Sequence, residues 1–269
     1  MNYLQYIIPQ HWLSRLMYRL TRVQNRAFKN AFIRWFVKTY QVDLSQAQRQ
    51  TPEQYQSFND FFTRALKENI RSLDDSAMIC PVDGQISQSG SIKKQEILQA
   101  KGRHYSVKAL LADEKKASAF DSGAFATIYL SPKDYHRIHM PWDGRLLTMD
   151  YIPGDLFSVN DKTTQSVDNL FARNERVVCY FQTDFGICAL IMVGAIFVGS
   201  IETIWEGQIT PPYGKKITHF DYTKKQIEIK QGSEMGRFNM GSTVILLMPN
   251  EIDWKMDSAQ LVKMGQALI

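Results

Sequence analysis

The sequence predicts an α+β protein in which N-terminal amphipathic helices precede a mainly antiparallel β body. Apolar residues recur at helical spacing over the first 40 positions. After Cys80 the chain consists of short β-like runs separated by Gly, Pro, Asp and Asn. The 269 residues are 44% hydrophobic and 22% charged, which is ordinary globular composition and excludes a disordered, collagenous or disulfide-scaffold protein.

Two N-terminal segments, residues 10–26 and 28–40, are expected to be helices with an apolar face and a separate basic face. Residues 1–42 contain seven basic and no acidic side chains, whereas the rest of the chain contains 25 basic and 27 acidic ones. Trp, Phe and Leu on one face with only basic charge elsewhere are typical of a helix that lies in a membrane surface. A surface helix packed on its own core is the alternative. The basic residues are Arg15, Arg19, Arg22, Arg26, Lys29, Arg34 and Lys38.

We therefore expect residues 1–50 to form a membrane-association arm whose partner is anionic lipid. The near-neutral body argues against nucleic acid as a partner over the whole surface. The longest apolar run, residues 189–201, is about 13 residues, shorter than the about 20 of a spanning helix. The N-terminus also lacks the features of a signal peptide. Three cysteines without metal-ligand spacing are expected to be reduced, namely Cys80, Cys179 and Cys188.

The remaining elements follow in order along residues 51–269. Residues 42–52 are polar and Gln-rich, and we expect a hinge there. A third helix is expected to start near residues 51–53, where Pro suits the first turn, or at Ser57, which can cap it together with Asp60. The clearest strands are residues 124–130, 176–183, 187–193 and 243–248.

His136 and His139 lie three positions apart and follow Ser131 and Pro132, where a turn or a short helical segment is expected. In a helix this spacing places both imidazoles on one face, but no nearby carboxylate completes a metal site. A catalytic base is the better interpretation, because the ordinary pKa of histidine, about 6.5, suits proton transfer at neutral pH. Two hydrogen-bonded loop histidines are the alternative.

Asp83 and Ser242 are the other candidates for a catalytic site. Asp83 follows an apolar segment and precedes Gly84, where a carboxylate can serve a turn or can be the buried acid of a nucleophile–base–acid set. Ser242 directly precedes an apolar strand, which by itself carries little functional weight. The sequence has neither a GxSxG nucleophile elbow nor a Gly-rich phosphate loop.

Taken together, these motifs resemble those of the bacterial phosphatidylserine decarboxylases, which are pyruvoyl-dependent enzymes. The resemblance covers nearly the whole chain and is most specific at the His-x-x-His segment and at the late Gly-Ser-Thr. Met240 departs from the usual Leu, a change that keeps size and apolarity. The matching segments are residues 58–64, 81–84, 97–102, 129–141, 153–160, 169–176, 234–238 and 241–243.

The resemblance implies a proenzyme that cleaves itself between Gly241 and Ser242, giving a large β chain (1–241) and a small α chain (242–269) from one catalytic domain (51–269). Ser242 would attack the Gly241 carbonyl, with His139 as the base and Asp83 orienting its imidazole. Elimination and hydrolysis would turn Ser242 into an N-terminal pyruvoyl group. This covalent group would be the cofactor, and neither a metal nor PLP is expected.

The implied reaction converts phosphatidylserine into phosphatidylethanolamine and carbon dioxide. The pyruvoyl group would form a Schiff base with the substrate amine and accept the electrons released on decarboxylation. His136 is a candidate proton donor or carboxylate contact in this step. The resemblance also implies peripheral association with the cytoplasmic side of the inner cell membrane, and a homodimer.

Two alternatives remain open from the sequence. The first is a membrane-associated serine hydrolase that uses Ser242, His139 and Asp83 on an external ester without self-cleavage. The second is a membrane-binding protein without catalytic activity. The length of the purified chain separates the first alternative from the proenzyme, because only the proenzyme is cut into two fragments.

Overall fold

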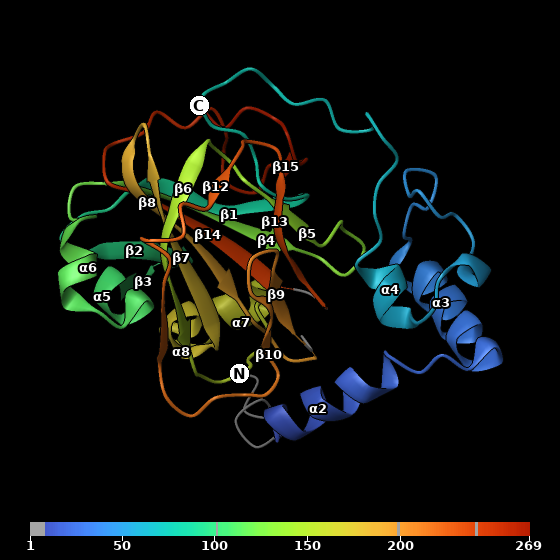
Figure 1. The fold of residues 1–269 in the computed structure, drawn as a ribbon. Coiled ribbons are helices and arrows are strands. Elements are labelled where there is room, and N and C mark those ends of the chain that lie inside the picture. Colours follow the sequence, from blue (N-terminus) through green and yellow to red (C-terminus); the bar gives the residue numbers. More distant parts are fainter. Residues whose placement is uncertain (1–8, 101, 198–199, 240–241) are drawn as a thin grey trace.

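The computed structural model describes residues 9–100, 102–197, 200–239 and 242–269 (Figure 1). The N-terminal part contains α2 (Gln10–Leu20), α3 (Arg26–Tyr40), the 3-10 turn η1 (Pro52–Gln54) and α4 (Phe58–Phe62). In Figure 1, α3 and α4 lie on the side of the β body opposite to α5 and α6. Helices at the N-terminus followed by a mainly antiparallel β body confirm the expected α+β class.

A nine-stranded antiparallel sheet forms the centre of the body. Its order is β11-β6-β7-β8-β14-β4-β1-β15, and β12 also pairs with β6. The small chain of the expected cleavage thus supplies a central strand, β14, and an edge strand, β15. The strands are β1 (Gly84–Ser91), β4 (Ala124–Leu130), β6 (Gly144–Ile152), β7 (Arg176–Thr183), β8 (Gly186–Val193), β11 (Thr218–Asp221), β12 (Glu228–Ile229), β14 (Ser242–Met248) and β15 (Leu261–Val262).

Smaller elements surround this sheet. A four-stranded sheet has the order β10-β9-β13-β5, and β2 pairs with β3 in a hairpin. Its strands and those of the hairpin are β5 (Arg137–His139), β9 (Ile201–Thr203), β10 (Gly207–Thr210), β13 (Glu234–Phe238), β2 (Glu96–Ala100) and β3 (Arg103–Ser106). The remaining helices are α5 (Val107–Leu111), α6 (Glu114–Ser118), α7 (Asp161–Thr164) and α8 (Leu170–Arg173).

The central strand β14 is apolar along its length because both faces of the large sheet are covered. Val244 and Leu246 belong to a core cluster shared with the four-stranded sheet. Ile245 and Leu247 point to the other face and belong to the cluster that includes residues of α5 and α8. Successive strand residues point to opposite faces, so a strand between two cores is a continuous apolar run.

The first expected helix is shorter than residues 10–26. α2 ends at Leu20, and α3 starts anew at Arg26, where the Asn25 side chain accepts a 3.0 Å hydrogen bond from the backbone N–H of Phe28. An Asn cap of this kind fixes a helix start and separates the two helices. The third helix has the expected cap, since the backbone N–H of Asp60 donates to Ser57 Oγ at 3.2 Å.

The segment 42–52 is packed against the body instead of being exposed throughout. Val42 and Ala47 are buried, and Ala47 forms a β-bridge with Leu66. Val42 joins a cluster in which Phe36 of α3 contacts Phe58 of α4, with ring centroids 5.0 Å apart. This aromatic cluster fixes α3 to the part of the chain that follows it. Among the described residues, no helix is both long and apolar enough to cross a bilayer.

Candidate active site

The register of the large sheet brings Asp83 and Ser242 to the same end of its strands. Gln85 of β1 pairs with Tyr129 of β4, and Tyr129 pairs in turn with Thr243 of β14. Asp83 precedes β1 and Ser242 begins β14, so both lie where β4 ends. Only β4 lies between β1 and β14, so these two strands are about 10 Å apart, which is twice the spacing of neighbouring strands.

Backbone hydrogen bonds tie His139 to the segment before β1 and His136 to the strand that precedes Ser242 in the chain. The N–H of His139, in β5, donates to the carbonyl of Pro81 at 2.9 Å, two residues before Asp83. The carbonyl of His136 accepts a 3.0 Å hydrogen bond from Phe238, the last residue of β13. The fold therefore gathers the segments that carry the candidate residues. Gly241 and Met240 lie outside the described residues, and Ser242 is described only by its place in β14.

The expected cleavage position lies where the chain crosses from one sheet to the other. β13 ends at Phe238 in the four-stranded sheet, and β14 begins at Ser242 in the large sheet. Asn239 is buried, and its N–H and Nδ2 donate to Ser200 O and Oγ, each at 2.9 Å. Asn59 of α4 donates from Nδ2 to Asn239 Oδ1 at 3.0 Å. Both ends of the crossing are thus held in place.

The hydrogen bonds and the burial of His139 make it a neutral base. Its Nδ1 lies 2.7 Å from the carbonyl oxygen of Gly232, and its Nε2 lies 2.9 Å from the hydroxyl of Tyr135. A carbonyl only accepts, so Nδ1 carries the proton and Nε2 accepts from the tyrosine. Burial lowers the pKa of His139. The basic nitrogen is therefore Nε2, and the carbonyl of Gly232 fixes this tautomer.

His136 is fully buried and has one free ring nitrogen. Nδ1 donates to the carbonyl of Asp134 at 2.8 Å, and the ring lies 4.1 Å from that of Phe62 between centroids. Nε2 has no hydrogen-bond partner among the described residues. Burial lowers the pKa of His136 to about 3, so the imidazole is neutral and Nε2 is an acceptor. A role as proton donor therefore requires that Nε2 first takes up a proton.

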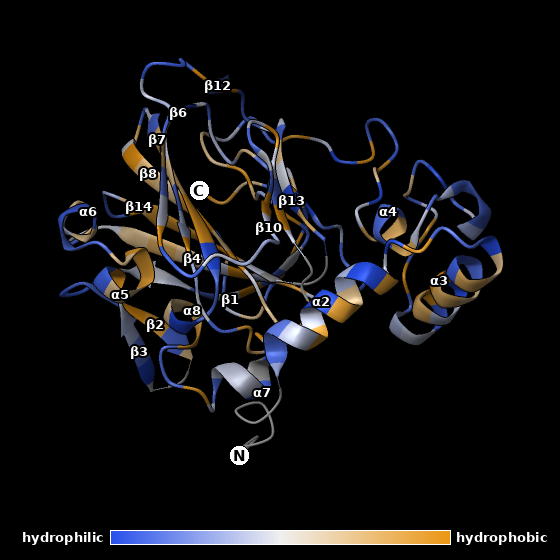
Figure 2. Cartoon of the chain, turned by 60° about the horizontal axis from the view of Figure 1, so that its bottom comes forward, coloured by the Kyte–Doolittle hydropathy of each residue, from blue (hydrophilic) through white to orange (hydrophobic). Residues whose placement is uncertain are grey.

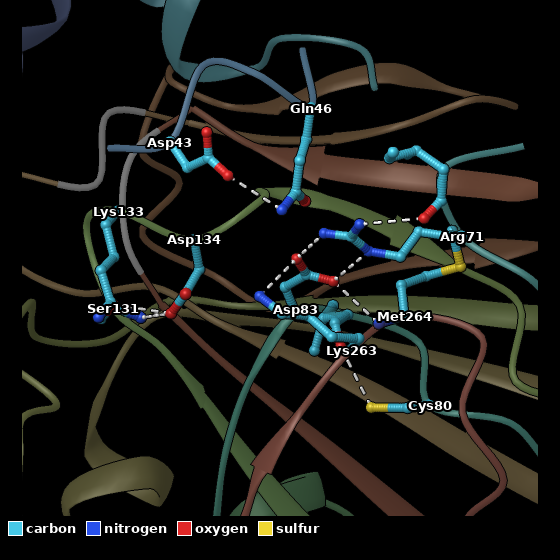
Figure 3. Close-up of polar contacts among 12 residues, drawn as sticks. Asp43, Gln46, Arg71, Cys80, Asp83, Ser131, Lys133, Asp134, Lys263 and Met264 are labelled. Atoms are coloured by element: carbon cyan, nitrogen blue, oxygen red, sulfur yellow. Dashed lines mark hydrogen bonds and ion pairs between the residues drawn. The ribbon is translucent and has the colours of Figure 1, made fainter. Parts of the chain in front are cut away.

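Asp83 is 2% exposed and is surrounded by donors from two separate parts of the sequence (Figure 3). Arg71 contacts it through Nε to Oδ1 at 3.1 Å and through a terminal nitrogen to Oδ2 at 2.5 Å. Lys263 Nζ lies 3.2 Å from Oδ2, and the N–H of Met264 donates to Oδ1 at 2.9 Å. Burial acts to raise the pKa of Asp83, but these hydrogen bonds and charges hold it below its ordinary value. Asp83 is therefore a carboxylate.

The expected direct contact between Asp83 and His139 is not formed in this structure. The Gly232 carbonyl takes the place on Nδ1 that the acid of a triad would take, and Asp83 faces Arg71 and Lys263. The sequence did not identify Arg71, Gly232 or Lys263 as part of the site. Their contacts join positions far apart in the chain, and none of them stands in a recognisable motif.

The spacing of the two histidines does not produce a helical pair. Ser131 N and Oγ both donate to Asp134 Oδ2, at 2.8 and 2.7 Å, which forms the expected turn. After the turn the chain enters β5, so His136 and His139 have different partners on different sides. Within the described part of the chain, no group of three or more His, Cys, Asp or Glu side chains could hold a metal ion.

A cavity of about 250 Å³ opens beside Asp83. Its lining includes Arg71 and Lys263, and also Arg64, Lys133 and Tyr135. Arg64 is almost fully buried and donates to the carbonyls of Lys133 and Asp134 at 2.9 and 3.2 Å. Asp43 and Asp134 also line the cavity, so its charges are mixed, and the Tyr135 hydroxyl connects it to His139.

A serine at the start of a central strand, beside buried imidazoles and a carboxylate, fits the class of pyruvoyl-dependent decarboxylases. Comparison with known families identifies the member: the model described as phosphatidylserine decarboxylase matches residues 58–269, and one described as PSD matches residues 3–41. The chain belongs to the phosphatidylserine decarboxylase family.

Curated relatives agree along almost the whole chain. A phosphatidylserine decarboxylase proenzyme of Methylococcus capsulatus is 50% identical over 271 residues, covering 98% of this chain and 94% of the relative. The proenzyme of Shewanella denitrificans is 52% identical over 273 residues, with the same coverage. That of Shewanella loihica is 50% identical over 274 residues, covering 98% and 96%. These matches confirm the expected family and the expected enzyme class, a decarboxylase made as a proenzyme.

Proposed function

We propose that this chain is the precursor of a phosphatidylserine decarboxylase that cleaves itself between Gly241 and Ser242. One observation carries the proposal: the segments of Asp83, His139 and Ser242 meet at one sheet edge in a chain about half identical to proenzymes of this name. The mature enzyme converts phosphatidylserine into phosphatidylethanolamine and carbon dioxide. No observation favours the serine hydrolase that stays intact.

Self-cleavage begins with the hydroxyl of Ser242. His139 Nε2 takes the hydroxyl proton, with the Tyr135 hydroxyl on that nitrogen as the relay, while Oγ bonds to the Gly241 carbonyl carbon. The peptide C–N bond breaks and its nitrogen gains a proton, which leaves an ester. Loss of the Ser242 α-proton then expels the Gly241 carboxylate and forms dehydroalanine. Water replaces the nitrogen as ammonia, and an N-terminal pyruvoyl group remains.

Asp83 supports this chemistry through the electrostatic effect of its negative charge on His139. It stabilises the imidazolium that forms when His139 accepts a proton, since an opposite charge nearby favours the charged form. Arg71 and Lys263 hold the carboxylate in position and keep it ionised. Lys263 and Met264 belong to the small chain, so the same contacts bind that chain to the large one after cleavage.

The surroundings of Ser242 fit a covalent pyruvoyl group at the start of β14. Ser242 pairs with Leu130 of β4, and from Thr243 onward β14 is paired on both sides, with β4 and β8. His136 offers a buried Nε2 that has no partner among the described residues, and its carbonyl binds the strand that leads toward Ser242. The pyruvoyl group supplies a carbonyl that accepts the electrons left by departing carbon dioxide. His136 would accept and return a proton at Nε2.

The N-terminal helices support association with the membrane that contains the substrate. Trp12 of α2 is 59% exposed and Trp35 of α3 is 54% exposed. Figure 2 shows hydrophobic segments on α2 and α3 next to hydrophilic ones. Exposed Trp beside basic residues is typical of helices that lie in a bilayer surface. We infer peripheral association with the cytoplasmic face of the cell membrane, and the homodimer stays a prediction.

Two variants test the function. The wild-type chain should separate into two fragments on a denaturing gel and release carbon dioxide from phosphatidylserine. Ser242→Ala should stay intact and inactive, and His139→Gln should slow cleavage at least about 100-fold because it removes the base. Ser258→Ala, a change in an exposed loop of the small chain, serves as the matched control and should cleave normally. An intact wild-type chain, or an active Ser242→Ala variant, would refute the proposal.

A further inference from the structure

A basic groove lies between α2 and the loop that follows β10. It has a volume of about 450 Å³. Arg15 and Arg19 of α2 line one side, and Gln208, Pro211 and Tyr213 line the other. No acidic side chain is among the described residues that line it. The groove therefore combines two cations with aromatic and proline walls.

Polar contacts hold α2 in the orientation that forms this groove. The Tyr18 hydroxyl donates to Gln208 Oε1 at 3.0 Å, directly at the groove. Ser14 Oγ accepts a 3.3 Å hydrogen bond from the N–H of Phe197, and Gln10 Oε1 accepts one of 2.7 Å from the N–H of Leu156. The polar face of α2 is thus the face that docks on the body, so its basic and apolar faces remain available.

The charges of the two arginines are unpaired within the described part of the chain. Neither Arg15 nor Arg19 forms a hydrogen bond or an ion pair with another described residue. The Arg15 guanidinium lies 5.7 Å from the centroid of the Tyr213 ring, which orients it by a cation–π contact. The Tyr213 hydroxyl is buried and also lacks a partner among the described residues. The two guanidinium groups offer several hydrogen-bond donors to one bound anion.

The apolar side chains beside the groove indicate where that anion comes from. Trp12, three residues before Arg15, and Leu16, one residue after it, are both exposed, and at about 100° per residue they lie about 60° and about 100° around α2 from Arg15. When these side chains enter a bilayer, the groove lies at the depth of the phospholipid headgroups. Guanidinium groups bind phosphate oxygens with two parallel hydrogen bonds.

We propose that the groove between α2 and the loop after β10 binds the phosphodiester headgroup of an anionic phospholipid in the bilayer. This inference rests on the proposed membrane association and adds a defined lipid site to it. Arg15 and Arg19 bind the phosphate oxygens, and the Tyr213 ring holds the Arg15 guanidinium at the groove. The residues of the groove differ from those around Asp83 and His139, so lipid bound here positions the enzyme without occupying the catalytic site.

Vesicle binding distinguishes a defined lipid site from non-specific electrostatic attraction between the basic arm and an anionic membrane. Sedimentation is measured with phosphatidylcholine vesicles that contain phosphatidylglycerol, an anionic lipid that is not the substrate. Arg15→Gln with Arg19→Gln is compared with Arg26→Gln with Lys38→Gln, which removes the same charge from exposed positions of α3. We expect the groove variant to bind about tenfold more weakly than the control variant, as for the loss of a charge-assisted hydrogen bond. Equal losses in both variants would overturn the proposal.

Further measurements identify the source of the anion and guard against misfolding. Tyr213→Phe keeps the ring that orients Arg15 and should leave vesicle binding and the melting temperature unchanged. Inorganic phosphate, titrated by calorimetry without vesicles, should bind the wild type only weakly. Tight phosphate binding that is lost in the groove variant would overturn the assignment to a bilayer lipid. Cleavage of the wild-type chain is scored separately, so an intact chain refutes the enzyme without deciding the lipid site.

Discussion

Asp83 connects the two parts of the chain that the proposed cleavage would separate. Arg71 from the large chain and Lys263 with Met264 from the small chain all donate to its carboxylate. Because the carboxylate is buried, its charge depends on these donors. The acid expected to orient a histidine therefore also organises the contact between the chains.

Replacing Arg71 by Met tests this role through pH. The hydrogen bonds from Arg71 help to hold the pKa of Asp83 below its ordinary value, so their loss raises that pKa. A depressed pKa stabilises the fold above the unfolded pKa, and this contribution is lost as pH falls through the folded pKa. The variant should lose about 3 kcal/mol near neutral pH, and its acid unfolding should begin at higher pH, measured by thermal melting.

The exposed pair of Lys230 and Asp143 provides the control for that experiment. Lys230→Met removes a cation from a carboxylate at the surface, where solvent screens the interaction, so little change is expected. Acid unfolding of the Arg71 variant that matches the wild type would contradict the assigned role.

Glu175 gives a second pH effect with the opposite sign. It accepts hydrogen bonds from Tyr151 at 2.7 Å and Thr210 at 3.1 Å, and no basic side chain in the described part of the chain pairs with it. Burial raises its pKa to about 7, so the folded state keeps a proton that the unfolded state loses. Stability therefore falls as pH rises from the unfolded pKa through the folded one.

Glu175→Gln should remove this pH dependence. Between about pH 5 and about pH 8 the wild type should lose up to about 3 kcal/mol relative to the variant, a bound that follows from the pKa difference. Melting curves of both proteins at several pH values measure it. Glu228→Gln, at an exposed position of β12, should follow the wild type, and parallel curves for Glu175→Gln would contradict the prediction.

At the residue level, the sequence predicted which segments meet but not how their side chains pair. Asp83, His136, His139 and Ser242 stand in motifs, and the sheet register brings their segments to one edge. The partners of His139 are a backbone carbonyl and a tyrosine, and a sequence pattern does not specify a carbonyl contact across 93 positions. Such contacts depend on tertiary packing and could not be read in advance.

At the level of elements, strands buried on both faces were the most predictable. Residues 124–130 and 176–183 form β4 and β7 with the expected bounds, while β8 and β14 each begin one residue earlier than expected. These strands are continuous apolar runs because a core covers each face of the sheet. Such a run is visible in the local sequence, so it can be predicted. The end of α2 was missed because it depends on the Asn25 cap of the next helix.

The hydrophobic pattern also did not predict which face of α2 packs against the body. Gln10 and Ser14 are buried, whereas Trp12 and Leu16 are exposed. An apolar stripe usually faces the core of the protein, so the pattern alone does not distinguish a core from a bilayer. The exposure of Trp12 and Leu16 supports the proposed membrane arm, while Leu13, Met17 and Leu20 of the apolar stripe are half-buried.

Trp12→Ser with Trp35→Ser tests this orientation. Both indoles are exposed, so the melting temperature should change little, while binding to anionic vesicles should weaken at least about tenfold through lost apolar burial. Ile187→Ser, an exposed apolar position in β8, serves as the control and should bind as the wild type does. Unchanged vesicle binding of the double variant would show that the indoles do not enter the bilayer.

At the level of the whole molecule, the fold prepares the chain for cleavage without dissociation. β14 lies between β4 and β8, and β15 pairs with β1. The carbonyl of Gln266 accepts a 2.7 Å hydrogen bond from Cys80, and the N–H of Leu268 donates to Met78 at 2.9 Å. A cut before Ser242 leaves all these contacts intact. The two chains should therefore remain one complex until the protein is denatured.

Mass spectrometry of the purified protein under denaturing conditions tests the central claim most directly. We predict a chain of residues 1–241 and a second chain of 28 residues, 242–269, whose first residue is a pyruvoyl group in place of Ser242. A single chain of 269 residues, or a small chain that begins with an unmodified serine, would contradict the account.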